Sequence, residues 1–193
     1  MPDHNQTAPG ELEVVRRFIN TWSIPNDTRE ESDVLPELVR TSQLWRKEFP
    51  HRVRSKSDAL GKLRRLRADL RGACHEEGAS EEALNEWFSS AALSVKARWM
   101  DGATKLTIES SEASFVGYIV AAVANAIASG EWARLKTCPD CQWAFYDHTR
   151  NGSKRWCGMT KGSADGRACG TIAKVTAYRA RERAREAIKA GVV

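Results

Sequence analysis

The sequence is poor in the residues and motifs of common catalytic sites. It has four histidines, His4, His51, His75 and His148, and their spacing does not suggest a catalytic triad. No glycine-rich phosphate loop precedes a helical pattern, and no Gly-x-Ser-x-Gly motif occurs. We therefore expect that the protein is not an enzyme.

Long apolar stretches are also missing. The first ten residues are polar and lack the apolar core of a signal peptide, and we expect residues 1–10 to be disordered. The longest apolar run, 115–128, is shorter than the roughly 20 residues that a helix needs to cross a bilayer. These absences predict a cytoplasmic protein without a membrane partner.

Four of the five cysteines lie in the last third of the chain, as a C-x2-C pair followed by two single residues: Cys138, Cys141, Cys157 and Cys169. A C-x2-C pair places two thiolates on one metal ion, and two later cysteines complete a tetrahedral shell, which predicts a bound Zn²⁺ ion. Disulfides or unrelated thiols are the alternatives, but disulfides require an oxidising compartment. His148 is a reserve ligand. The Gly/Ser-rich stretch 162–166 is expected to be a loop that returns Cys169 to the ion.

A zinc ion in this setting has a structural role. Four thiolates fill its coordination shell and leave no open position for a catalytic water. Metal binding supplies much of the folding free energy of so small a unit. We therefore expect a Cys138→Ser change to unfold the tail and to leave the rest of the chain folded.

Charge is divided unevenly along the chain. Residues 134–193 contain 13 Lys and Arg against 5 Asp and Glu, whereas residues 1–133 contain 17 against 20. A basic tail on a mildly acidic body is typical of a protein that binds a polyanion, of which nucleic acid is the commonest.

The part of the chain before the cysteines has the periodicity of helices. Apolar residues recur at helical spacing over 11–22, 34–49, 57–74, 80–92 and 115–128. Alternating residues on both sides of Asp101-Gly102, over 93–99 and 106–109, predict a β-hairpin. The predicted fold class is mainly α with a small β-hairpin. The cations of the third helix are expected to form a solvated face: Lys62, Arg64, Arg65, Arg67 and Arg71.

A cationic helix is predicted after the last cysteine, over 171–189. One stripe of this helix carries Lys174, Tyr178, Arg181 and Arg185. Its apolar residues Ile172, Val175 and Ala187 are expected to face inward. Such a helix can follow a duplex groove with its arginines at phosphates or guanine edges, whereas a solvated helix with internal ion pairs is the alternative.

The polar residues around the cysteines fall into two predicted roles in nucleic-acid binding. Phosphate contacts are expected from Lys154, Arg155 and Lys174. Base edges require forked donors or mixed donor and acceptor groups. Such groups are carried by Arg150, Asn151, Arg179 and Arg181. The neighbouring Trp143 and Trp156 are expected to form a small core around the metal ligands rather than to stack on bases.

The cysteine region resembles the CGNR-type zinc finger of bacterial transcription regulators. The matching motifs are the Cys138/Cys141 pair, Trp143 to Asp147, Arg150-Asn151-Gly152, Arg155-Trp156-Cys157 and Cys169-Gly170, followed by a basic helix. The chain departs from the family pattern in an insertion before Cys169 and in Thr171-Ile172, where the family has Asn-Arg. The resemblance implies a treble-clef-like zinc finger that binds DNA.

The first part of the chain resembles the ABATE domain, which precedes this finger in stress-response regulators. The resemblance rests on Phe18 to Thr21, Leu66 to Arg71 and the Asp101-Gly102 hairpin. It implies a sensory or oligomerising domain, with a small-molecule effector or a second copy of the chain as partner. Four tryptophans are candidates to line a pocket or a dimer interface: Trp22, Trp45, Trp87 and Trp99.

The sequence therefore predicts a disordered N-terminus at 1–10, a helical domain at 11–136, and a zinc finger with its basic helix at 137–190. The function expected is that of a zinc-dependent transcription regulator that binds double-stranded DNA. The alternative hypothesis is a non-catalytic zinc module that binds RNA or a protein partner, because the Thr171-Ile172 departure removes a family arginine.

Overall fold

The computed structural model describes residues 6–25, 28–50, 52, 57–74, 81–159 and 168–189. Its described part contains seven α-helices and three two-stranded antiparallel sheets. The helices are α1 (Leu12–Ile19), α2 (Leu35–Arg40), α3 (Ser42–Glu48), α4 (Leu60–Ala73), α5 (Glu81–Ser90), α6 (Phe115–Ala128) and α7 (Cys169–Lys189). The strands are β1 (Trp22–Ser23), β2 (Ser32–Asp33), β3 (Leu93–Met100), β4 (Ala103–Ser110), β5 (Leu135–Thr137) and β6 (Ala144–Tyr146). This confirms the mainly α class with small antiparallel strand pairs.

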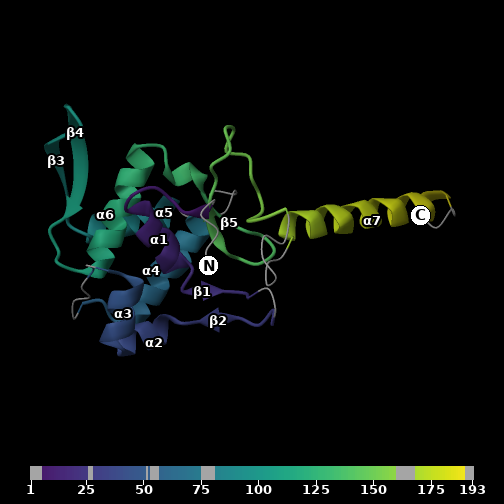
Figure 1. The fold of residues 1–193 in the computed structure, drawn as a ribbon, viewed down its shortest axis with the longest axis horizontal. Coiled ribbons are helices and arrows are strands. Elements are labelled where there is room, and N and C mark those ends of the chain that lie inside the picture. The colour runs from purple at the N-terminus through teal and green to yellow at the C-terminus, as the bar shows by residue number, and fades with distance from the viewer. Residues whose placement is uncertain are drawn as a thin grey trace.

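Helices α1 to α6 pack into one body, with the apolar helix α6 in its core (Figure 1). Both predicted bounds of α6 are confirmed, and the Ser114 hydroxyl caps the helix by accepting a bond from the Gly117 N–H at 2.9 Å. The buried Asp58 carboxylate accepts two more of the free N–H groups at this end. Phe115 packs edge-on against Phe18 and Trp45, so α6 is fixed against α1 and α3. None of the described helices is long and apolar enough to cross a membrane.

Two predicted helices differ from the observed ones: one ends earlier, and the other is divided in two. α1 stops at Ile19 because the Thr21 hydroxyl bonds to the Phe18 carbonyl at 2.7 Å, and Trp22 belongs to β1. The helix predicted over 34–49 is two helices, since Thr41 has the extended backbone of an N-cap residue. The strands β1, β2, β5 and β6 were not predicted, because two or three residues are too few to show a period.

The hairpin β3–β4 forms with the predicted turn and projects from the body at the end opposite α7 (Figure 1). Asp101 and Gly102 both have positive φ, as a two-residue hairpin turn requires. The Asn125 side chain joins the hairpin to α6 by bonding to both the N–H and the carbonyl of Ile108. One face of the hairpin exposes Val95, Trp99 and Leu106.

The solvated face predicted for α4 is wrong for two of its arginines. Arg67 is 6% exposed and forms two bonds to the Asp33 carboxylate, at 2.7 and 3.0 Å. Arg71 is half-buried and donates to the carbonyls of Ile19, Trp22 and Gln142. Buried guanidinium groups need such partners, and the partners come from segments far away in the sequence.

Other expectations for the body are also corrected. Gln6 and Ala8 are in contact with the rest of the chain, so the disorder predicted for 1–10 does not hold for residues 6–10, and residues 1–5 lie outside the described part. Of the four tryptophans, Trp45 and Trp87 are core residues and Trp22 lies under Arg71. Trp99 alone among them is largely exposed, with 74% of its surface accessible.

Candidate metal centre and basic surfaces

The four cysteines predicted as metal ligands meet at one place. Cys138 directly follows β5, and Cys141 lies in the turn before β6. The turn is closed by bonds from the Gln142 N–H to the Cys138 carbonyl and from the Cys138 N–H to the Trp143 carbonyl. Cys157 comes from a loop, and Cys169 is the first residue of α7. All four residues are buried.

The cluster has the dimensions of a zinc site. The four sulfur atoms all lie within 4.8 Å of one another, and the shortest contacts are 3.5 Å for Cys141–Cys157 and 3.7 Å for Cys157–Cys169. Four sulfurs placed tetrahedrally at about 2.3 Å from one ion are about 3.8 Å apart. A disulfide needs about 2.05 Å, and all four cysteines are free. These residues therefore fit Zn²⁺, as predicted. His148 takes no part, since it is exposed and its Nε2 lies 2.8 Å from the Thr7 carbonyl.

The pKa values of the four cysteines favour binding of a cation at the cluster. Hydrogen bonds from the Cys141 and Cys157 thiols lower the pKa of Cys138, and the bond to Cys138 raises the pKa of both of these neighbours. Burial raises the pKa of Cys169. Zinc binding therefore has to displace protons from the thiols whose pKa is raised.

The finger is attached to the body through backbone hydrogen bonds around the first two ligands. Asn20, the residue that ends α1, pairs with Ala144 on β6, donating to its carbonyl at 2.9 Å and accepting from its N–H at 2.7 Å. Arg71 donates to the Gln142 carbonyl at 2.8 Å, and the Ile24 N–H donates to the Cys141 carbonyl. Burial lowers the pKa of Arg71 to about 10, which leaves it charged at neutral pH. The Cys138/Cys141 turn is thus held by helices α1 and α4.

The loop that carries four of the predicted nucleic-acid residues is organised by Asp147. This fully buried carboxylate accepts bonds from the Thr149 N–H and hydroxyl and from the Lys154 N–H. Burial opposes its charge, but these bonds and one from Lys136 outweigh it and lower the pKa of Asp147. Arg150, Asn151 and Arg155 are exposed on this loop, and Lys154 is half-buried with its ammonium group over the Phe145 ring.

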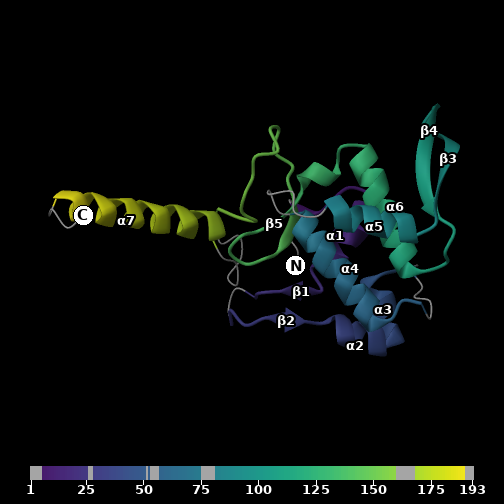
Figure 2. The ribbon, with the colours of Figure 1, turned by 180° about the vertical axis from the view of Figure 1, so that it is seen from behind.

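The remaining predicted residues lie on α7, which projects away from the body (Figures 1 and 2). Lys174, Arg179 and Arg181 are all exposed. The expectation that Ile172 and Val175 face inward is wrong, since 37% and 42% of their surfaces are accessible, and the side chain of Ala187 lies outside the described part. Beyond its first turn, which packs at the metal centre, the helix exposes both of these apolar residues and the cations beside them. The structure therefore arranges the seven predicted residues in two groups, one on the loop and one on α7.

Comparison with protein families supports the metal centre. Residues 134–182 match the CGNR zinc finger, a range that includes all four cysteines and the first two thirds of α7. No curated protein matches the sequence. The chain thus contains a CGNR zinc finger with four cysteines placed to bind zinc, while the resemblance of the body to the ABATE domain stays a prediction, as does the division at 136/137.

The residues that support the site from outside the cysteine motif were not predicted from the sequence. Asn20 and Arg71 hold the Cys138/Cys141 turn, while Lys136 and Arg134 donate to backbone carbonyls of the loop 147–154. The 57–74 stretch offered one signal of this. It places four arginines on one helix, and the body is rich in acidic residues with which some of these arginines can form buried ion pairs. The Gly/Ser-rich stretch 162–166 lies outside the described residues.

Proposed function

We propose that the protein binds double-stranded DNA through its zinc finger and α7, and acts as a transcription regulator. The observation that supports this most is α7 itself. It is a helix of 21 residues that stands clear of the body and carries exposed cations along its length. Lys174, Arg179 and Arg181 form no ion pair with any described residue, so their charge is available to a polyanion.

The distribution of side chains on α7 suits a groove of DNA. At 100° per residue, Lys174, Arg181 and Arg185 fall on one side of the helix, and Arg179 and Arg183 fall on the other. Between the two rows lies a strip of small residues: Ala173, Ala177, Ala180 and Ala184. Small residues let a helix backbone approach base edges, while arginines on both sides reach the two strands. We infer that this face enters the major groove.

The loop 147–156 is the second contact in this proposal. Lys154 and Arg155 contact phosphates, and Arg150 and Asn151 face base edges. The zinc ion has a structural role, since four thiolates leave no position for a substrate, and we infer that the protein is not an enzyme. The start of α7 at Cys169 favours a treble-clef arrangement, in which the metal fixes the direction of the helix.

The experiment is a fluorescence-anisotropy titration of the zinc-loaded protein with labelled duplex DNA. Arg179→Ala/Arg181→Ala should weaken binding to the preferred site by about 1–3 kcal/mol for each lost base contact. Lys154→Ala/Arg155→Ala should weaken binding to all duplexes alike and flatten the salt dependence by about two units. Arg46→Ala/Lys47→Ala, which removes the same charge from exposed positions on α3, is the matched control. If both test variants bind duplex DNA as tightly as the Arg46→Ala/Lys47→Ala control, the basic surfaces do not contact DNA.

A protein partner is the second candidate, and the hairpin β3–β4 favours it. Val95, Trp99 and Leu106 are each more than 60% exposed on one face, and exposed apolar groups of this size mark association surfaces. We propose a second copy of the chain as the partner at this face. Sedimentation analysis of the wild type and of Trp99→Ser is the test. A wild-type dimer that dissociates in Trp99→Ser would support the proposal, and a monomer in both cases would exclude the dimer.

A further inference from the structure

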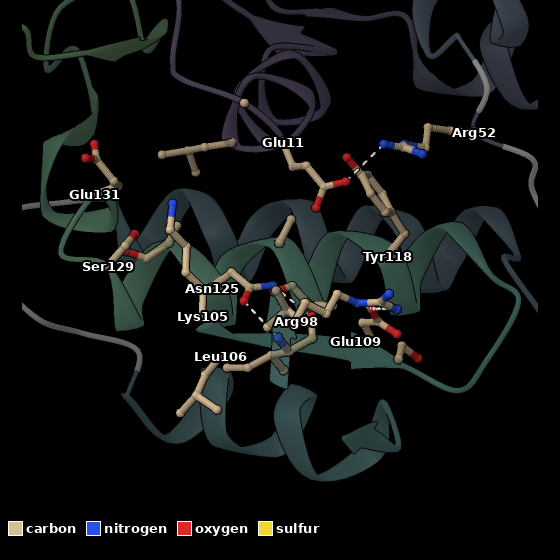
Figure 3. A pocket seen from close by; sticks show the side chains of 18 of the residues that line it. Glu11, Arg52, Arg98, Lys105, Leu106, Glu109, Tyr118, Asn125, Ser129 and Glu131 are labelled. Atoms are coloured by element: carbon tan, nitrogen blue, oxygen red, sulfur yellow. Dashed lines mark hydrogen bonds and ion pairs between the residues drawn. The ribbon is translucent and has the colours of Figure 1, made fainter. Parts of the chain in front are cut away.

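A cavity of about 1000 Å³ lies on the far side of the body from α7, between α6, the hairpin β3–β4 and residues 9–12. This volume is at the upper end of the range for ligand pockets. Figure 3 shows Glu11, Arg52 and Tyr118 at one end of the cavity and Ser129 and Glu131 at the other. It is separate from the metal centre and from both basic surfaces.

The cavity opens beside the contact between the hairpin and α6. The Asn125 side chain joins the two elements there by bonding to the backbone N–H and carbonyl of Ile108 on β4. On the α6 side, the cavity is lined by the small apolar residues Ala121, Ala122 and Ala126. Met100, on the hairpin face opposite to Trp99, also lines the cavity and is 44% exposed. An apolar surface with space above it is therefore available to a ligand.

Two of the three buried polar atoms that lack a hydrogen bond among the described residues lie at one end of the cavity. The Arg52 Nε and the Tyr118 hydroxyl are buried and have no hydrogen-bond partner among the described residues. The Arg52 guanidinium stacks on the Tyr118 ring at 3.9 Å and forms an ion pair with Glu11 at 3.1 Å. Glu11 is 57% exposed, and a pair so open to solvent costs little to break. Burial and the nearby Glu11 carboxylate raise the pKa of Tyr118, so its hydroxyl stays neutral and able to donate to a carboxylate in the place of Glu11.

We propose that this cavity binds a small carboxylic acid with an apolar body. Its carboxylate takes the place of Glu11 beside Arg52 and accepts a hydrogen bond from the Tyr118 hydroxyl, while its apolar part lies on the alanine face of α6. An anion fits this end because the Arg52 guanidinium is positively charged and has an unsatisfied N–H, and the Tyr118 hydroxyl can donate a hydrogen bond. This inference is independent of DNA binding.

The test uses a fluorescent fatty acid, dansyl-aminoundecanoic acid, and its methyl ester with the full zinc-loaded chain. We expect the acid to bind about tenfold more tightly than the ester, since a hydrogen bond to a charged group exceeds one to a neutral group. Tyr118→Phe should weaken binding of the acid about tenfold and leave binding of the ester unchanged. Ala121→Trp, which fills the cavity from α6, should abolish binding of both probes. Circular dichroism checks that each variant is folded.

Trp99→Ser tests the proposed dimer face as the alternative binding place, because Trp99 is the largest exposed apolar side chain among the described residues and does not line the cavity. Binding that survives Ala121→Trp but is lost in Trp99→Ser would place the probe on the hairpin face and overturn the proposal. Equal affinity for the acid and the ester, no effect of Tyr118→Phe, or no binding of either probe to the wild type would also overturn it.

Discussion

Removal of the Asn20 side chain should destabilise the body and the finger together. Asn20 is the one side chain that both donates to and accepts from Ala144, at 2.9 and 2.7 Å, and Ala144 is fully buried. In Asn20→Ala the Ala144 carbonyl keeps a bond from Arg16 at 3.3 Å, but its N–H has no described partner left. A buried N–H without a partner costs about 1–3 kcal/mol, so we expect a loss of about 2 kcal/mol in the free energy of unfolding.

The assay is urea unfolding in excess zinc, followed by circular dichroism for the helices and by chelator competition for the metal. Asn85→Ala, at an exposed position of α5, is the matched control and should change stability by a few tenths of a kcal/mol at most. We expect Asn20→Ala to unfold at lower urea and to lose zinc to the chelator faster. If its stability stays within about 0.5 kcal/mol of the wild type, the hydrogen bonds between α1 and β6 do not hold the finger to the body.

Two further predictions concern the metal. Cys138→Ser should lower the bound zinc, measured by elemental analysis, from one ion per chain to none. Arg71 and Asn20 then lose ordered partners, so we also expect the body to unfold at a lower temperature. The sequence alone had indicated that the body stays intact. If the thermal transition of the body is the same in Cys138→Ser as in the wild type, the body does not depend on the metal centre. Zinc affinity should fall as pH falls, because the pKa values of Cys141, Cys157 and Cys169 are raised and zinc must displace protons from these thiols. Competition titrations at several pH values measure this slope, and a flat profile would show that the thiols are already ionised.

Features set by neighbours in the sequence could be predicted. The metal ligands follow from the C-x2-C spacing and thiol chemistry, and the hairpin follows from Asp101-Gly102 between alternating strands. α6 has the expected bounds because Ser114 caps it and its apolar residues need burial. In each case the determinant lies within a few residues of the element that it defines.

Features set by distant partners could not be predicted. Arg67 and Arg71 look like surface residues until β1, β2 and the Cys138/Cys141 turn are placed beside α4. The apolar residues of α7 indicated an inward face, but periodicity does not show whether a surface is there to receive it. Cys74, the cysteine outside the metal centre, is buried in the core, and burial raises its pKa to about 12. The sequence contains the residues but not the contacts that change their roles.

The most direct test of DNA binding is a salt titration of the zinc-loaded protein against duplex DNA, single-stranded DNA and RNA of matched length. We predict that duplex DNA binds most tightly, that log affinity falls linearly with log salt concentration, and that removal of zinc abolishes the preference for duplex. Equal or tighter binding to RNA or to single strands at every salt concentration would contradict it, as would affinity that does not depend on salt.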